Sequence, residues 1–142
     1  MPSDHPYKAF RFQVEIEGIL KAGMTDISGL KIETAVKPMP EGGMNNGMHQ
    51  IIEGTSYSDI TMKRGLCSLD LYAWYFAVTQ GKVLRLNVTI FLLGDTGEPV
   101  MLWNLFDAFP KTWEGPVFSA SSSQVATETI TLAHEGMVAL PV

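Results

Sequence analysis

The sequence predicts a mainly β domain, a barrel or sandwich of antiparallel strands with one apolar α-helix at about residues 69–80. Three observations lead to this fold class. Apolar and polar residues alternate in several separate segments, which is the period-two pattern of strands with one buried face. Turn-forming residues, such as the pair Asn46-Gly47, separate the segments. One stretch departs from the alternation and has the length of a helix. At 142 residues, the chain is expected to form a single domain, residues 1–142.

The alternation places the strands in chain order. The first covers residues 10–17, where four apolar residues alternate with charged and polar ones. The second covers residues 30–37 and is ended by Pro38, and a shorter one surrounds Ile60 and Met62. A fourth covers residues 84–92. A late strand carries Ile130 and Leu132 opposite a row of threonines, and β-branched residues favour strands. Each strand is expected to bury its apolar face.

The sequence LDLYAWYFAVTQ, residues 69–80, predicts the helix. Ser68 is its expected N-cap, Asp70 lies in its first turn, and Gly81 follows its end. The apolar residues do not keep to one stripe, so the helix is expected to be buried on nearly all sides. One sheet covers only one side of a helix. The rest is covered either by long loops of the same chain or by a neighbouring subunit.

Composition and charge exclude several classes of protein. The net charge is −5 and the largest basic cluster is the pair Lys63–Arg64, which argues against a protein that holds nucleic acid by its overall charge. The single cysteine, Cys67, excludes an intrachain disulfide and favours cytosolic production. No secretion signal is visible, and no apolar run approaches the roughly 20 residues that span a bilayer.

No arrangement of residues predicts catalysis. The histidines His5, His49 and His134 are not spaced like metal ligands, and Cys67 is expected to be a buried, inert thiol. Neither a nucleophile elbow nor a phosphate-binding glycine loop is present. We therefore expect no catalytic residue, no metal and no cofactor. An enzyme of unrecognised mechanism is the weakest alternative.

Glu128 stands out because counting by twos from Ile130 and Leu132 places it on their apolar face. A carboxylate on that face must be paired or lie in water, because burying an isolated charge is costly. Two interpretations follow. Glu128 lies at an exposed end of its strand, or it forms an ion pair or hydrogen bond between subunits. The candidate partners are Lys63, Arg64 and Lys111.

Three blocks of the chain resemble the T4-type phage tail tube family. The first, residues 10–30, is similar to the family's opening strand and its Ser-Gly-Leu turn, and the second, residues 57–75, to its strand, Lys-Arg-Gly corner and aromatic helix. The third, residues 99–136, joins an aromatic segment to a strand that ends in Leu-Ala-His-Glu-Gly. Its matching residues are Trp103, Asp107, Ala108, Phe109 and Pro110, then Glu128, Leu132, Ala133, His134, Glu135 and Gly136.

The resemblance implies a structural subunit. Members of the family form hexameric rings that stack into a hollow tube inside a contractile sheath, with strands of the six subunits joined in an inner barrel. The implied partners are other copies of the chain, a sheath protein, baseplate components and a tube terminator. DNA or protein cargo passes through the lumen only transiently, and no membrane anchoring is implied. The chain is expected to be made in the bacterial cytoplasm and to become part of a phage tail or an injection particle.

Within that interpretation, the residues divide into two hypothetical groups. A bridging loop at residues 41–53 and two further residues are candidates for assembly: Gly42, Gly43, Met44, Asn45, Asn46, Gly47 and Met48, with Trp74 and Glu128. Polar residues of the strands at 30–37 and 57–64 are candidates for the lumen: Lys31, Glu33, Asp59 and Lys63. One alternative stays open, because a barrel that carries an apolar ligand in its cavity shows the same alternation.

Overall fold

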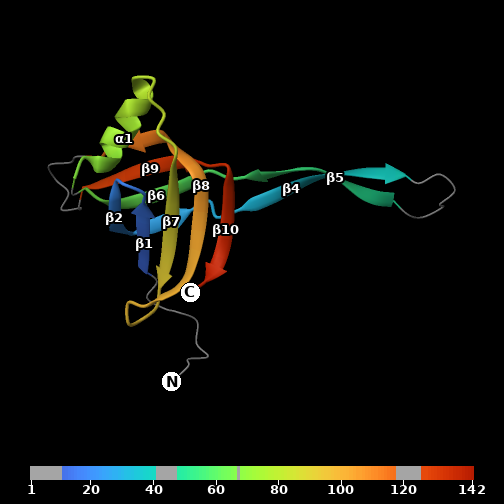
Figure 1. The fold of residues 1–142 in the computed structure, drawn as a ribbon, viewed down its shortest axis with the longest axis horizontal. Helices are drawn as coiled ribbons and strands as arrows, with labels where there is room; N and C mark the ends of the chain where they lie inside the picture. Colours follow the sequence, from blue (N-terminus) through green and yellow to red (C-terminus); the bar gives the residue numbers. More distant parts are fainter. Residues whose placement is uncertain (1–10, 41–47, 67, 118–125) are drawn as a thin grey trace.

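A computed structural model describes residues 11–40, 48–66, 68–117 and 126–142 of the chain (Figure 1). These residues confirm the mainly β fold with antiparallel strands and a single helix. In chain order the elements are β1 (Arg11–Ile16), β2 (Leu20–Met24), β3 (Asp26–Ser28), β4 (Ile32–Pro40), β5 (Met48–Tyr57), β6 (Ile60–Gly65), α1 (Asp70–Thr79), β7 (Leu86–Leu93), β8 (Pro99–Glu114), β9 (Thr127–Ala133) and β10 (Gly136–Pro141).

The strands of the body form a barrel-like wall. Hydrogen-bonded neighbours follow the order β2-β1-β7-β8-β9-β6-β3. Only Thr25 separates β2 from β3 in the chain, and its N–H donates to the carbonyl oxygen of Lys63 on β6 at 2.8 Å. The continuous β2–β3 segment therefore pairs with β1 along its first part and with β6 along its second, so the strand path returns to its start.

Strand β8, 16 residues long, connects two parts of this wall. Asp107 interrupts it with a φ of 53°, a left-handed conformation that aspartate tolerates better than most residues. The side-chain oxygen of Asn87 accepts the N–H of Asp107 at 3.4 Å, which supplies a partner for the amide at this irregularity. Before Asp107, β8 pairs with β7 and β10; after it, β8 pairs with β9, apart from a last β7 pair between Ala108 and Leu86.

The interior of the barrel is filled by the apolar sides of the predicted strands. The alternation confirmed for β1, β6, β7 and β9 turns one set of residues inward. The fully buried apolar side chains of these strands are Val14, Ile16, Ile60, Met62, Val88, Ile90, Ile130 and Leu132. Full burial of such residues stabilises a fold by roughly 1.5–3 kcal/mol each before the entropy of ordering the chain is counted.

Helix α1 is less buried than its composition predicts. Only Leu71 and Trp74 are buried, while Tyr72 and Phe76 are exposed and Leu69, just before the helix, is 69% exposed. Burial on nearly all sides is therefore not reached within one chain, and cover by a neighbouring subunit stays a prediction. Loops of the described residues do not cover the outer side of the helix, and β8 is the element it packs against.

The predicted end of α1 is confirmed, and its predicted start is wrong. Gly81 has a φ of 83° and donates to the carbonyl of Val78, while Lys82 donates to that of Ala77, a pairing that requires a left-handed residue after the helix. At the other end, the N-cap residue is Leu69, with no side-chain cap. The hydroxyl of Ser68 instead accepts a hydrogen bond from Arg64.

Among the described residues, strands β4 and β5 pair only with each other, and they project from the body as a two-stranded arm (Figure 1). The predicted end at Pro38 is wrong, because β4 continues to Pro40. A strand with a free edge tolerates proline, since no ladder hydrogen bond is lost on that side. The predicted buried face is also absent, because Ile32 and Val36 are half exposed. Of the predicted bridging loop, residues 48–53 belong to β5 and residues 41–47 lie outside the described residues.

Among the residues that the structure describes, no helix has both the length and the apolar character needed to cross a membrane.

Trp74 gives a direct test of how α1 is attached. Its indole is 3% exposed and Nε1–H donates to the carbonyl of Leu84 at 2.8 Å. We expect Trp74→Ala to lower the free energy of unfolding by about 3–5 kcal/mol, because the site cannot fully collapse around the lost ring. Urea denaturation followed by circular dichroism measures this change. Leu69→Ala is the matched control on an exposed residue and should change stability by no more than about 0.5 kcal/mol. Equal effects of the two substitutions would contradict the packing.

Candidate functional site

A buried ion pair links two strands of the wall. Arg64 on β6 and Glu128 on β9 are direct cross-strand partners, and both side chains point inward. They are 3% and 1% exposed, and Nε of Arg64 donates to Oε1 of Glu128 at 2.6 Å. Two opposite charges at one register position satisfy each other inside the barrel, where either alone would be strongly unfavourable.

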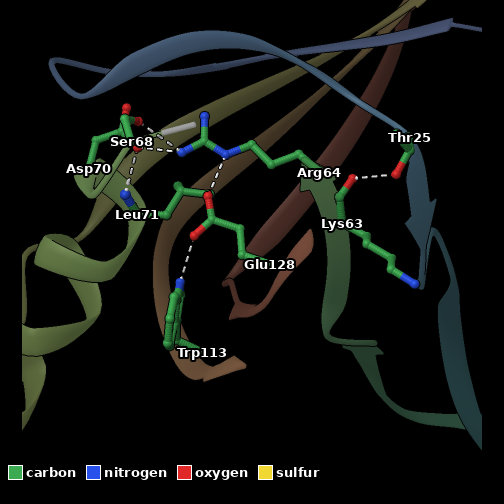
Figure 2. A network of polar contacts seen from close by, with 8 residues as sticks. All are labelled: Thr25, Lys63, Arg64, Ser68, Asp70, Leu71, Trp113 and Glu128. Carbon is green, nitrogen blue, oxygen red and sulfur yellow. Dashed lines mark hydrogen bonds and ion pairs between the residues drawn. The ribbon is translucent and has the colours of Figure 1, made fainter. Parts of the chain in front are cut away.

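The pair extends into a network that reaches α1 and β8, as Figure 2 shows. The second oxygen of Glu128, Oε2, accepts the indole N–H of Trp113 on β8 at 2.8 Å. On the other side, a terminal N–H group of Arg64 donates to Ser68 and to Asp70 at the start of α1. Asp70 also accepts the N–H of Leu71 at 2.9 Å. The network therefore joins β6, β8, β9 and the start of α1 through one guanidinium and one carboxylate.

The network shifts the pKa values of two of its members. Burial alone raises the pKa of Asp70, but hydrogen bonds from Ser68 and Arg64, together with the charge of Arg64, outweigh burial and hold that pKa below its ordinary value. For Arg64, burial alone lowers the pKa, and the hydrogen bonds to Glu128 and Asp70 raise it overall. Both groups are therefore charged at neutral pH, as an ion pair requires.

The interpretation of Glu128 needs correction. The carboxylate is buried, so Glu128 does not lie in water at a strand end. Its partner among the three candidates is Arg64 of the same chain, so the ion pair is not one between subunits. Lys63, the next residue, points outward and is exposed, and Lys111 pairs with Asp59 at 2.8 Å. The alternation of side chains along the strand predicted the inward direction of Glu128 correctly. Alternation within one strand does not, however, identify the partner on the neighbouring strand.

A second polar cluster, around His134, holds the root of the arm, and strand periodicity does not predict its contacts. His134, between β9 and β10, has Nδ1 3.1 Å from the carbonyl oxygen of Gly136 and Nε2 3.0 Å from that of Ser58. Its ring also contacts that of Tyr57, the last residue of β5, with the centroids 5.6 Å apart. A carbonyl oxygen only accepts, so a hydrogen bond here is donated by whichever ring nitrogen carries the hydrogen. His134 thus fastens the end of the arm to the start of β10.

The arm itself presents apolar side chains to solvent. The register places Ile32, Val36 and Ile52 on one face, with the hydroxyls of Thr34 and Thr55 3.2 Å apart between them. Ile52 is 71% exposed. A two-stranded ribbon is marginally stable by itself in water, and exposed apolar residues add to its need for a partner. We call Ile32, Val36 and Ile52 the arm stripe.

The wall has a contrasting polar face outside β6 and β9. Thr61 and Lys63 on β6 lie opposite Thr131 and Thr129 on β9, and the hydroxyls of Thr61 and Thr131 are 3.3 Å apart. We call these four residues the polar face. Of the residues predicted to line a lumen, Lys63 belongs to it, and Asp59 lies exposed just before β6. Lys31 and Glu33 lie at the root of the arm, where they form an exposed ion pair at 3.8 Å.

The other predicted site residues are placed as follows. Trp74 is buried within the chain, and Gly42, Gly43, Met44, Asn45, Asn46 and Gly47 lie outside the described residues, as do His5 and Cys67. Met48 and His49 open β5. Within the described part of the chain, no three side chains of His, Cys, Asp or Glu gather as metal ligands do.

These features define a structural β-barrel subunit whose apolar arm and helix are turned outward. Comparison with known families identifies it further. The chain belongs to the T4-like virus tail tube protein gp19 family, whose family model matches residues 8–138. It is therefore a subunit of a tail-type tube and part of an assembled particle. This assignment replaces the alternative of a carrier for an apolar ligand.

Solved structures support the same assignment. The chain is 27% identical to one in the cryo-EM structure of an extracellular contractile injection system, the PVC sheath–tube complex in the extended state. The two superpose with a TM-score of 0.85 over 98% of this chain and 94% of the other. It is 25% identical to a chain of the anti-feeding prophage tube-terminating cap, with a TM-score of 0.85 over 100% and 95%. Among curated proteins, no sequence matches.

The fold also occurs in more distant proteins. Hcp1 from Flavobacterium johnsoniae is 11% identical and superposes with a TM-score of 0.57 over 91% of this chain and 94% of its own. At that identity the likeness concerns the fold alone.

The buried pair predicts a large loss when one charge is removed. Glu128→Ala leaves Arg64 buried without its more deeply buried counter-ion, so we expect the free energy of unfolding to fall by about 3–5 kcal/mol. A double variant, Arg64→Met with Glu128→Leu, removes both charges and should recover much of that loss. Urea denaturation measures both. Glu33→Ala, which breaks the exposed pair with Lys31, is the control and should cost at most about 1 kcal/mol. A double variant no more stable than Glu128→Ala would contradict the argument.

The lowered pKa of Asp70 predicts a pH dependence. Because the folded pKa lies below that of the unfolded chain, ionised Asp70 stabilises the fold fully above the ordinary aspartate pKa, about 3.9, and this contribution is lost as the pH falls from there through the folded value. Asp70→Asn should therefore be less stable than the unsubstituted protein at neutral pH, and the difference should shrink in acid. Denaturation curves from neutral pH downward measure it. A difference that stays constant with pH would show that Asp70 acts without its charge.

Proposed function

We propose that six copies of the chain form a ring and that the rings stack into the hollow inner tube of a contractile phage tail or injection system. The observation that carries the proposal is the arm, an ordered ribbon with apolar side chains exposed on a protein of the tail tube family. Such a ribbon is stabilised when another copy covers it, and a tube supplies that copy at every position.

The proposed partners are inferred from the assemblies in which similar chains occur. They occur in a sheath–tube complex, in a sheath/tube terminator assembly and in the baseplate of the anti-feeding prophage. We infer that this chain likewise contacts a sheath protein, baseplate components and a terminator. It is made in the bacterial cytoplasm and joins the particle there. Its cargo is DNA or protein, which contacts it only in passing.

The polar face suits the wall of such a lumen. Its threonine hydroxyls can form hydrogen bonds with water. The charged residues beside it carry both signs, with Asp59 paired to Lys111 and Asp26 opposite Lys63. A surface without a strong field of one sign lets a charged polymer pass without being held. Lys31 and Glu33, which pair with each other at the arm root, extend this surface in the proposal.

Residues 41–47 complete the proposed assembly surface. They connect the two strands of the arm and carry three glycines, which allow the backbone to adjust on contact. In the proposal, this segment reaches a neighbouring subunit or the next ring.

Electron microscopy over a concentration series, with light scattering, tests the proposed function. We expect the purified protein to form rings or tubes with a central hole. Ile52→Asp should stay folded, because residue 52 is exposed, yet it should fail to assemble because a charge replaces part of the arm stripe. Lys63→Gln on the polar face is the control and should assemble normally. Protein that remains monomeric at every concentration, or tubes formed equally by Ile52→Asp, would contradict the proposal.

A further inference from the structure

Two strand edges in the described chain carry neither a partner nor a guarding residue. β1, β6 and β7 are paired along both edges, and the part of β8 that extends past β7 is contacted by α1. Free edges remain on β2, β3, β4, β5 and β10. Soluble proteins protect such edges with charges, prolines or short length, because an open edge pairs readily with another chain.

Three of these edges are protected. β2 carries Lys21, and β3 has only 3 residues and begins with Asp26. β4 carries Lys37 between its exposed residues and has prolines at positions 38 and 40, which cannot donate a ladder hydrogen bond.

The edges of β5 and β10 are unprotected. β10 reads GMVALP and contains no charged residue, and its only proline is the last one. β5 contains no proline, and its single charged residue, Glu53, falls at the irregularity where the arm register shifts. Along each free edge, the N–H and C=O groups that point away from the paired strand have no strand partner among the residues that the structure describes.

Apolar side chains flank both edges. On β10, Val138 and Leu140 point outward and are 44% and 42% exposed, with Leu140 opposite Leu102 of β8. On β5, Ile51 and Ile52 are exposed. Pairing the two edges would satisfy the backbone groups and bring these side chains together, which is how an added strand gains both affinity and specificity.

We propose that the free edge of β5 in one copy pairs with the free edge of β10 in the next copy. This inference rests on the proposed function and names the contact that joins neighbouring subunits. The two edges are different surfaces of one chain, so the contact is head-to-tail and is repeated by every subunit. When such a ring closes, each copy has donated its arm and received one, and no unprotected edge remains.

Complementation between two assembly-defective variants tests the pairing without assuming a register. Ile52→Lys places a charge on β5 that blocks pairing at its edge, and it leaves β10 unchanged. Val138→Lys blocks pairing at the β10 edge in the same way, and it leaves the arm unchanged. Each alone should remain a folded monomer. Mixed together, they have one usable interface, the arm of the Val138→Lys chain on the β10 edge of the Ile52→Lys chain. Analytical ultracentrifugation should then show a heterodimer of twice the monomer mass and nothing larger.

The matched control mixes two variants with the same defect. Ile51→Lys and Ile52→Lys both place a charge on β5, so neither chain has a usable β5 edge and their mixture should stay monomeric. A heterodimer in this control, or none in the test mixture, overturns the β5–β10 pairing. So does normal ring formation by either single variant. These outcomes differ from failure of the proposed function, in which the unsubstituted protein itself forms neither rings nor tubes.

Discussion

The buried pair of Arg64 and Glu128 fixes how the barrel is put together. A one-residue slip between β6 and β9 would turn one charge outward and leave the other unpaired inside, so the pair excludes neighbouring registers at a cost of several kcal/mol. Its remaining hydrogen bonds reach Trp113 on β8 and Asp70 on α1. The helix therefore takes its position from the same charges that set the strand register. That position exposes Tyr72 and Phe76 along one side of the body.

Strand alternation made most of the body predictable from sequence. Local periodicity decides which face of β1, β6, β7 and β9 is apolar, and every such face is buried. The same rule placed Glu128 inside, against the usual preference for exposed carboxylates. It could not identify Arg64 as its partner, because cross-strand register depends on residues 64 positions apart in the chain. The polar cluster around His134 could not be predicted for the same reason, since one of the two carbonyl oxygens that its ring contacts belongs to Ser58, far away in the chain.

The arm shows where periodicity misleads. Residues 32–36 alternate as regularly as those of β1. In the described part of the chain, however, β1 lies between two strands over a core, whereas β4 pairs with β5 alone. Alternation predicts that a strand has one apolar face that is stabilised by burial. It does not predict whether the surface that covers this face belongs to the same chain. The helix likewise carries more apolar residues than the described part of its own chain covers. The arm and the helix therefore both present apolar surfaces that a single copy leaves exposed.

The polar cluster around His134 connects β5 and β10, the two elements of the proposed subunit contact. Ser58 follows the arm directly and Gly136 opens β10, so one imidazole contacts the root of the donating element and the start of the receiving one. Tyr57 packs on the same ring, which limits how the arm can swing relative to β10. In a head-to-tail ring, the angle between donating and receiving elements within each subunit sets the rotation from one subunit to the next. A rigid joint at this point therefore favours one ring size over a mixture, because each added copy is turned by the same amount.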